Sequence, residues 1–520
     1  MGNKNNAPKR TKTKINKKVE DDFFLEGYEI VNDNTVNKNF KKRYSQVIKF
    51  NSNMLIQNVH NDPLKIYHTQ KLLGKGTFGE VYLVKHNRTG VIRAMKVIEK
   101  KNVELHGEEL SDEEILNEIN ILKKIDHPNI MKIFEFYQTS TTYYLILEFC
   151  EGGNLYDFVY ENHLSEFQVI YIMFQIFSAM NYCHKMKILH RDLKPDNILI
   201  KKNQDGLCRV KICDFGTSAI FNKGEIQKEI IGTLCYMAPE VLNEKYNQKC
   251  DLWSCGVVMY ILLTGKRPFI GRDDDQIIEK ILFDKYNTDL LKKYNKHTKD
   301  LLRRLLEKNP EKRISAEEAL NHKVFQLNKT KEILNEIQDE KKLFKFIDNL
   351  KHYKSNSILR ETTLAYFVHN YPDLEEVNEA SKLFDKLDVN GKGKITKNEL
   401  YKGLSLIIKS DEELRKNIDE IFLNLDMDNN NYISYEEFIR AAVDKKVFLK
   451  EEILKFAFQY FDKDNSGKIT IDELEMVFKD SIKSKDYKKE LDNILKEVDT
   501  NNDNVIDFGE FKKLMNNILN

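Results

Sequence analysis

Four short stretches in the last third of the chain repeat one spacing of oxygen-bearing side chains. They span residues 388–399, 426–437, 462–473 and 499–510, and each ends in a glutamate at its twelfth position. Ca²⁺ binds six to eight oxygens, which such a loop supplies from positions 1, 3, 5, 7, 9 and 12. The repeat therefore predicts four helix–loop–helix units that are built around calcium sites.

The four loops differ in how completely they meet this requirement. Asn431 and Asn504 replace the glycine of the sharp turn in the second and fourth loops, but asparagine tolerates a positive φ. In the first loop Lys392 occupies the fifth ligand position, so we expect weak or absent binding there. The expected calcium ligands are Asp388, Asn390, Lys394, Thr396, Glu399, Asp426, Asp428, Asn430, Tyr432, Glu437, Asp462, Asp464, Ser466, Lys468, Glu473, Asp499, Asn501, Asp503, Val505 and Glu510.

A second group of motifs lies upstream, beginning with a glycine-rich turn at Gly74–Val81 between two strand patterns. Glycines allow a backbone to approach phosphates closely and to present N–H groups to their oxygens. Lys96, on the following strand, is placed to hold phosphate oxygens. Glu118, on the helix after that strand, could pair with Lys96 and fix its position.

The chemistry of phosphoryl transfer is indicated by the run His190–Asn197. In this run Asp192 can orient an attacking hydroxyl, Lys194 can neutralise the transferring phosphoryl group, and Asn197 can bind Mg²⁺. Asp214 follows in an Asp-Phe-Gly sequence and would hold Mg²⁺ that bridges the phosphates. These residue types predict a phosphoryl-transfer site that uses Mg²⁺.

In this order, and completed by Ala238–Glu240 and Arg313, the motifs resemble those of the eukaryotic protein kinases. The resemblance implies two lobes, one small and β-rich and one larger and helical. It also implies, from Lys194, transfer to Ser and Thr hydroxyls of proteins. The ATP contacts that it implies are Leu73, Gly74, Lys75, Gly76, Thr77, Phe78, Gly79, Val81, Ala94, Lys96, Leu147, Glu148, Cys150 and Leu199.

The segment between Asp214 and Glu240 suggests how the kinase is kept active. Ala219–Gly232 contains no Ser, Thr or Tyr, although it contains Glu225 and Glu229. Kinases switched by loop phosphorylation pair the new phosphate with an arginine, which corresponds here to Arg191. Our hypothesis is that the carboxylate of Glu225 or Glu229 replaces that phosphate.

The joint between the two motif groups has a pattern of its own. Residues 341–360 mix apolar with basic side chains, as in the amphipathic helices that calmodulin-like lobes bind, although an ordinary connector helix is the alternative. Together, residues 67–520 resemble a calcium-dependent protein kinase of the plant and protist type. That resemblance implies no need for separate calmodulin, and a junction that holds the kinase inactive without calcium.

The expected fold class is multidomain α+β. We predict a flexible basic extension (1–66), a bilobal kinase domain (67–325), an autoinhibitory junction (326–372) and an all-α calmodulin-like domain (373–520). Two alternatives stay open: a constitutively active kinase whose EF-hands are structural, and a calcium-responsive scaffold without catalysis.

Composition limits the partners and the compartment. Lys and Arg number 83 against 82 Asp and Glu, and a balanced charge argues against nucleic-acid binding. The 7 cysteines lack metal or disulfide spacing, which indicates a reducing cytoplasm. Gly2 and the basic residues after it could attach the chain to a membrane by myristoylation, but Asn6 departs from the preferred Ser or Thr and a solvated tail is the alternative. We expect a monomer.

Overall fold

The structure is a computed structural model, and it describes the chain from Ile56 to Asn516 with gaps. The described residues are 56–59, 62–76, 79–100, 104–105, 108–109, 112–202, 208–222, 225–325, 340–353, 357–372, 374–388, 391–405, 408, 410–426, 430–478 and 487–516. The predictions for Gly2, Thr77, Phe78, Asn390 and Asp428 therefore lie outside the described residues.

The small lobe is built on a six-stranded sheet with the order β1-β7-β8-β4-β3-β2. Helix α2 packs on it through fully buried Ile119 and Ile121. β1 pairs in parallel with β7, so the end of the expected flexible extension belongs to the sheet, which corrects that prediction. The elements are β1 (Gln57–Val59), β2 (Tyr67–Gly76), β3 (Gly79–His86), β4 (Ile92–Glu99), β5 (Glu104–Leu105), β6 (Glu108–Glu109), α2 (Asp112–Lys124), β7 (Ile133–Gln138) and β8 (Thr142–Leu147).

The large lobe is mainly helical and is organised around α4 and α6. A capping box between Ser165 and Gln168 starts α4, and Gly265, at φ 70°, ends α6. α6 is apolar on all sides because it runs through the middle of this lobe. The elements are α3 (Leu155–Glu161), α4 (Glu166–Lys185), β9 (Ile188–Leu189), β10 (Ile198–Lys202), β11 (Cys208–Ile212), β12 (Ala219–Ile220), α5 (Pro239–Leu242), α6 (Lys249–Thr264), α7 (Asp274–Phe283), α8 (Lys296–Leu305) and α9 (Ala316–Leu320).

The C-terminal region consists of paired helix–loop–helix units. Short strands join the loops two by two: Ile395 pairs with Ile433, and Ile469 with Ile506. The elements are α13 (Glu375–Leu387), β13 (Lys394–Thr396), α14 (Lys397–Leu404), α15 (Asp411–Leu425), β14 (Tyr432–Ser434), α16 (Tyr435–Ala442), α17 (Glu451–Phe461), β15 (Lys468–Ile469), α18 (Ile471–Phe478), α19 (Tyr487–Val498), β16 (Ile506–Asp507) and α20 (Phe508–Asn516).

Within its described residues, 340–353 and 357–372, the junction forms two helices, where the sequence pattern indicated one over residues 341–360. α11 (Glu340–Lys351) packs on α15 and α16, and Phe344 stays half exposed. α12 (Ile358–Asn370) packs on α16 and α17, and all 13 of its residues are buried. α12 is therefore the more enclosed of the two helices. Because it is buried on every side, it has no exposed polar face, and an amphipathic pattern does not reveal it in the sequence.

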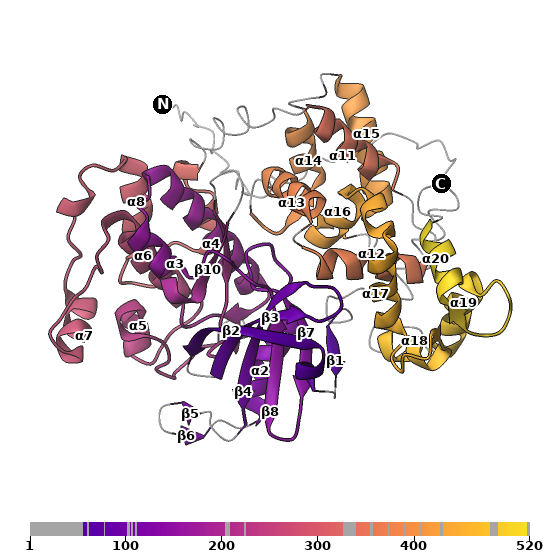
Figure 1. The fold of residues 1–520 in the computed structure, drawn as a ribbon. Coiled ribbons are helices and arrows are strands. Elements are labelled where there is room, and N and C mark those ends of the chain that lie inside the picture. Colours follow the sequence, from indigo (N-terminus) through magenta and orange to yellow (C-terminus); the bar gives the residue numbers. More distant parts are fainter. Residues whose placement is uncertain are drawn as a thin grey trace, which may run out of the picture.

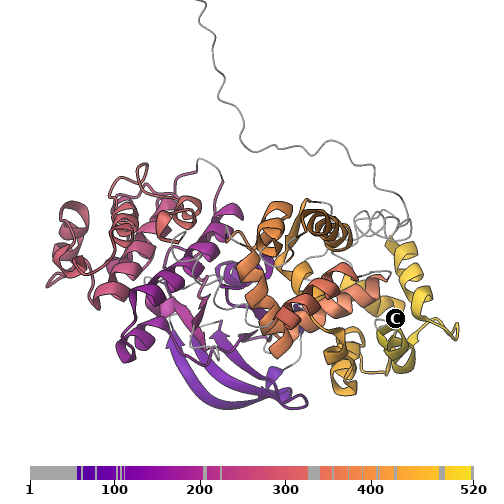
Figure 2. The same cartoon turned by 90° about the horizontal axis from the view of Figure 1, so that it is seen from above.

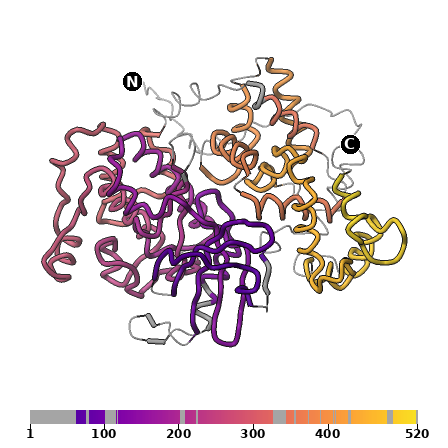
Figure 3. The backbone as a smooth tube through the Cα atoms, in the orientation of Figure 1, coloured from indigo at the N-terminus to yellow at the C-terminus, as the bar shows by residue number. Residues whose placement is uncertain are grey.

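The C-terminal region lies beside the kinase lobes, as two views at right angles show (Figures 1 and 2). The backbone trace follows the chain from the small lobe through the large lobe to this region (Figure 3). At the contact, His369 of α12 is bonded through Nε2 to the carbonyl of Ile133, at 3.1 Å. Arg93 of β4 donates to the carbonyl of Asn370. Within the described part of the chain, no helix has both the length and the apolarity to span a membrane.

Candidate functional site

The strand lysine and the helix glutamate meet between the two lobes. Lys96 Nζ lies 2.8 and 2.9 Å from the two carboxylate oxygens of Glu118, and 3.6 Å from Asp214 Oδ1. Burial alone would lower the pKa of Lys96, but the two carboxylates outweigh it and raise the pKa above its ordinary value. The ammonium group is therefore charged and held in a fixed place.

Asp192 is the centre of a second cluster, in the catalytic loop. Its Oδ1 accepts hydrogen bonds from the N–H and the hydroxyl of Thr233, at 2.9 and 2.8 Å. Its Oδ2 accepts from Lys194 Nζ at 2.8 Å and from Asn197 Nδ2 at 3.2 Å. Lys194 also donates to the hydroxyl of Thr233, at 2.8 Å. The carboxylate is thus oriented by donors from both the catalytic loop and the activation segment.

The residues expected to hold Mg²⁺ are suited to a cation. Asp214 has φ 63°, an uncommon backbone conformation that turns its side chain toward Lys96. Its Oδ1 is buried and accepts no hydrogen bond within the described residues. The Lys96 ammonium lies 3.6 Å away, too far for a hydrogen bond, so a metal ion would complete the environment of this oxygen and the carboxylate fits a metal ligand.

The catalytic loop is braced from below by a buried aspartate. Asp251 accepts hydrogen bonds from the N–H of His190 at 3.1 Å and of Arg191 at 3.0 Å. Arg191 has φ 69°, so these two bonds offset the strain of a left-handed residue. The His190 ring packs on the ring of Phe215 with centroids 4.9 Å apart. This contact ties the loop to the segment that carries Asp214.

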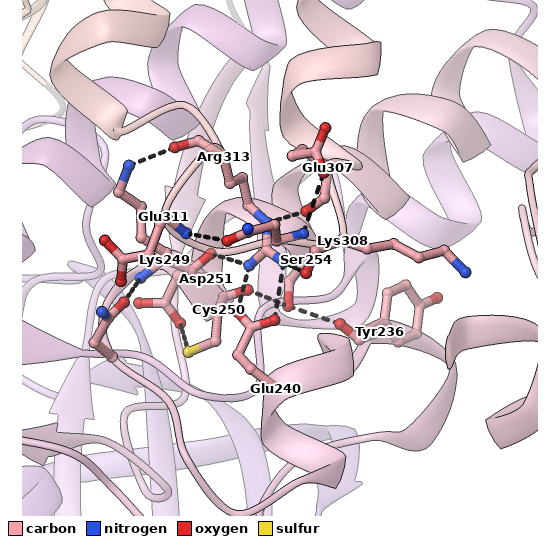
Figure 4. A network of polar contacts seen from close by, with 12 residues as sticks. Tyr236, Glu240, Lys249, Cys250, Asp251, Ser254, Glu307, Lys308, Glu311 and Arg313 are labelled. Atoms are coloured by element: carbon pink, nitrogen blue, oxygen red, sulfur yellow. Dashed lines mark hydrogen bonds and ion pairs between the residues drawn. The ribbon is translucent and has the colours of Figure 1, made fainter. Parts of the chain in front are cut away.

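A further buried ion pair lies under the activation segment, in the network of Figure 4. Arg313 donates to both carboxylate oxygens of Glu240, from Nη2 to Oε2 at 2.9 Å. Arg313 also bonds to the carbonyls of Lys249 and Glu307, at 2.8 Å each. The pair expected from the sequence is therefore formed, and it joins the end of the activation segment to the helices of the large lobe.

The hinge between the lobes contains an ion triad that sequence reasoning missed. Glu148 is almost fully buried, and its two oxygens each lie 2.7 Å from a lysine, Lys201 on β10 and Lys211 on β11. Burial alone would raise the pKa of Glu148, but the two lysines hold it well below its usual range. The sequence signal for this triad is a lysine at an inward-facing position of an otherwise apolar strand, as at Lys201 and Lys211.

The N–H groups of the hinge are not equivalent. The N–H of Glu148 donates to the carbonyl of Lys132 at 2.9 Å, whereas no hydrogen bond within the described residues uses the N–H of Cys150. Of these two groups, that of Cys150 is the one positioned to donate to a bound base.

The other residues expected around ATP come from both lobes. Ala94 pairs with Leu147 across β4 and β8, and Val81 and Leu199 pack on the same core.

The glycine-rich turn is a hairpin in which Gly76 pairs with Gly79, and Leu73 and Gly74 lie on β2 just before it. A Cβ at Gly79 would lie 2.0 Å from the carbonyl oxygen of Val97, so only glycine fits there. Lys75 pairs with Glu80, at 2.7 Å.

Of the two glutamates considered for the activation segment, the structure places one at the arginine. Arg191 Nη1 lies 2.7 Å from Glu229 Oε2. Glu225 instead accepts from the N–H of Asn222, at 2.8 Å. Tyr246 donates to the carbonyl of Glu229 at 2.8 Å and fixes the segment that carries it.

The third and fourth loops bring their carboxylates together as a calcium site requires. In each loop three carboxylates offer oxygens within 4.8 Å of one another, and the two groups are Asp462, Asp464 and Glu473, and Asp499, Asp503 and Glu510. The turn residues Asn504 and Gly467 have φ 62° and 84°, as this geometry needs. Ser466, Asn501 and the backbone of Lys468 and Val505 lie in the same two loops.

In the first and second loops the opening aspartate accepts hydrogen bonds from two later N–H groups of its loop. Asp426 accepts from the N–H groups of Asn430 and Asn431 at 3.0 and 3.1 Å. Asp388 accepts from those of Lys392 and Gly393 at 2.9 and 2.7 Å. Glu399 and Glu437 form capping boxes with Thr396 and Ser434, and Lys394 and Tyr432 lie on β13 and β14.

Fold and site together define a protein kinase that is joined to two pairs of EF-hands. A protein kinase domain model matches residues 67–325, and an EF-hand domain pair model matches 378–443 and 451–516. Calcium-dependent protein kinase 4 of Plasmodium berghei (strain Anka) is 38% identical over 94% of this chain and 93% of its own. Calcium-dependent protein kinase 4 of Plasmodium falciparum (isolate 3D7) is 39% identical, over 91% and 90%. The chain belongs to the calcium-dependent protein kinase family.

Proposed function

We propose that this kinase transfers the γ-phosphate of Mg²⁺-bound ATP to Ser and Thr hydroxyls of proteins. Asp192 would orient the attacking hydroxyl, since Thr233 and Asn197 already fix its carboxylate. Lys96 and Lys194 would hold the phosphate oxygens. Mg²⁺, held by Asp214 and Asn197, would supply neutralising charge on the phosphates when bound.

We also propose that calcium switches this activity on. The observation that supports the proposal best is the enclosure of α12, whose 13 residues are all buried. In this arrangement the catalytic groups are assembled, and α12 is packed on α16 and α17 of the EF-hand region. Without calcium, the junction (326–372) would hold the kinase inactive.

Calcium can shift such an equilibrium only if it binds one arrangement more tightly than the other. A change from 1:99 to 99:1 requires about 5.5 kcal/mol of differential binding, which several coordinated sites can supply. The third and fourth loops, whose carboxylates are already gathered, are well suited to this role.

Substrate choice follows from a position next to the hinge. Kinases that select basic residues before the target commonly carry a glutamate after the paired glycines, where this chain has Asn154. Asn154 instead caps α3 by accepting from the N–H of Asp157, at 2.8 Å. We therefore propose only a weak preference for arginine upstream of the target residue.

The decisive experiment measures phosphate transfer from Mg²⁺-ATP to a panel of Ser and Thr peptides, with calcium and with chelator. We expect activity in calcium only, and none in an Asp192→Asn variant under either condition. Equal activity in chelator would make the EF-hands structural. No transfer despite bound ATP would favour a calcium-responsive scaffold.

The predictions for location and assembly concern features outside the described residues or outside a single chain. We propose a cytoplasmic monomer that acts without separate calmodulin. Attachment to a membrane through Gly2 stays a prediction, and the intact mass of the N-terminal peptide from native material tests it.

A further inference from the structure

The first EF-hand loop lies against the large kinase lobe. A Cβ built on Gly391 would come within 3.2 to 3.3 Å of three kinase side chains, Phe174 and Ser178 of α4 and Leu320 of α9. A Cβ on Gly393 would lie 3.1 Å from the ring of His127. The loop backbone itself therefore contacts the kinase, without side chains between them.

A chain of hydrogen bonds crosses this contact. His127 Nδ1 accepts from the N–H of Asn129 at 3.1 Å, so the neutral ring carries its proton on Nε2. Nε2 donates to Ser178 Oγ at 3.0 Å, and the Ser178 hydroxyl donates to the carbonyl of Gly391, also at 3.0 Å. Every donor and acceptor along this path is used, so the kinase receives the loop at one defined place.

Charged residues extend the contact on both sides. Lys392, which occupies the fifth ligand position, lies 3.4 Å from Glu317 of α9. Lys185 of α4 shares Glu317, at 3.5 Å. On the other side Arg209 of β11 pairs with Asp385, one turn before the loop. The ammonium group of Lys392, which we expect to weaken calcium binding by this loop, therefore forms an ion pair with the kinase.

Comparison among the loops shows that Gly391 is not required by the loop backbone. The fourth position has φ 59° in the first loop, and 59° and 60° at Asn465 and Asn502 in the third and fourth loops. Asparagine thus fits this position in two loops of the same chain. Asn465 and Asn502 are exposed, whereas kinase side chains occupy the space that a side chain at position 391 would need.

We propose that the first EF-hand loop is a docking loop for the large kinase lobe, in which Gly391 and Lys392 have adapted a calcium-binding loop to a protein surface. This inference deepens the calcium regulation of the proposed function and rests on it for its biological consequence. The docking itself is a structural property, so it can be measured without any kinase assay.

Two substitutions test the steric argument as a matched pair. Gly391→Asn introduces a side chain that the loop tolerates but the kinase does not. Gly467→Asn makes the same change in the third loop, at a position where no heavy atom lies within 4 Å of the added Cβ and where Asn431 and Asn504 stand in other loops. Only the first should weaken docking.

Docking is read by hydrogen–deuterium exchange of the full-length protein, in saturating calcium and in chelator, at the amides of residues 126–133 and 391–396. The relevant condition is the one, calcium or chelator, in which these amides exchange more slowly in the wild type. In that condition we expect Gly391→Asn to raise their exchange rates about fivefold or more, because overpacking weakens the contact. Gly467→Asn should leave exchange unchanged. Equal exchange in the wild type and Gly391→Asn in both conditions would overturn the proposal.

Lys392 is tested by a second pair in the same protein. Lys392→Met removes the ion pair with Glu317 and should raise exchange about two- to fivefold, as expected for a partly exposed pair, without adding a calcium ion. Lys392→Asp should raise it at least as much and bind about one calcium ion more per chain by calorimetry. Unchanged exchange in both variants, or no additional ion with Lys392→Asp, would contradict the role of Lys392. If the exchange rates change as described but kinase activity is equal with calcium and with chelator, only the proposed calcium switch is refuted and the docking loop is not.

Discussion

At the scale of single residues, the activation segment shows how one carboxylate can substitute for a phosphate. Arg191 Nη1 lies 2.7 Å from Glu229 and its Nε donates to the carbonyl of Thr217. The arginine of the catalytic loop is thus tied to two points of the activation segment. Glu225 is bonded locally to Asn222 and takes no part in this link.

Glu229→Gln should therefore lower the calcium-stimulated turnover number. The side chain of Glu229 is 65% exposed, so solvent screens the pair and we expect a loss of about two- to fivefold. Steady-state kinetics with a Ser peptide measures it. Glu225→Gln is the matched control and should retain full activity, and equal rates for the two variants would refute the assignment.

At the scale of secondary-structure elements, the packing of α4 against the segment after α2 buries the side chain of His127. Burial, and next the charges of Lys211 and Arg209, lower the pKa of His127 to about 3. The folded protein therefore keeps the ring neutral, while the unfolded chain protonates it below its ordinary pKa of 6.5. Unfolding takes up a proton between these two values, so the stability falls as the pH falls through this range.

This linkage predicts a pH effect that one substitution removes. Between pH 7 and pH 5.5 the His127 contribution to the free energy of unfolding should fall by about 1 kcal/mol. Denaturant unfolding of the wild type and His127→Gln at both pH values measures the difference. A fall of equal size in both proteins would show that His127 is protonated in the folded state.

At the scale of the whole molecule, three of the four loops show two different arrangements. The third and fourth gather three carboxylates each, while the first lies on the kinase through Gly391 and Lys392. The gathered carboxylates and the loop that touches the large kinase lobe therefore lie at different ends of the EF-hand region, and α17 also contacts the small lobe through Gln459 and Phe456. α12 connects these ends because it packs on both α16 and α17.

Replacing the last ligand of the first, third and fourth loops should separate calcium binding from kinase contact. Glu473→Gln or Glu510→Gln removes a bidentate ligand, and we expect the calcium concentration for half-maximal activity to rise roughly tenfold. Glu399→Gln keeps the capping box with Thr396, since glutamine serves there as well, and should shift the midpoint little. A large shift with Glu399→Gln alone would show that the first loop senses calcium.

The sequence alone determined those features whose parts lie close together along the chain. A calcium loop supplies its ligands from twelve consecutive residues, so its spacing can be read directly, as can Lys392 at a ligand position. The kinase motifs are similarly local, and their resemblance to those of protein kinases implied the bilobal fold and the roles of Asp192 and Asp214.

Only the tertiary structure decided which distant residues meet. The structure pairs Glu229, and not Glu225, with Arg191. It brings Lys201 and Lys211 to Glu148. It also buries α12, whereas the amphipathic pattern had favoured residues 341–360. Each of these choices depends on the packing of elements far apart in the chain. A helix that is buried on every side has no exposed polar face to reveal it, and a charge pair formed between distant elements has no fixed spacing in sequence.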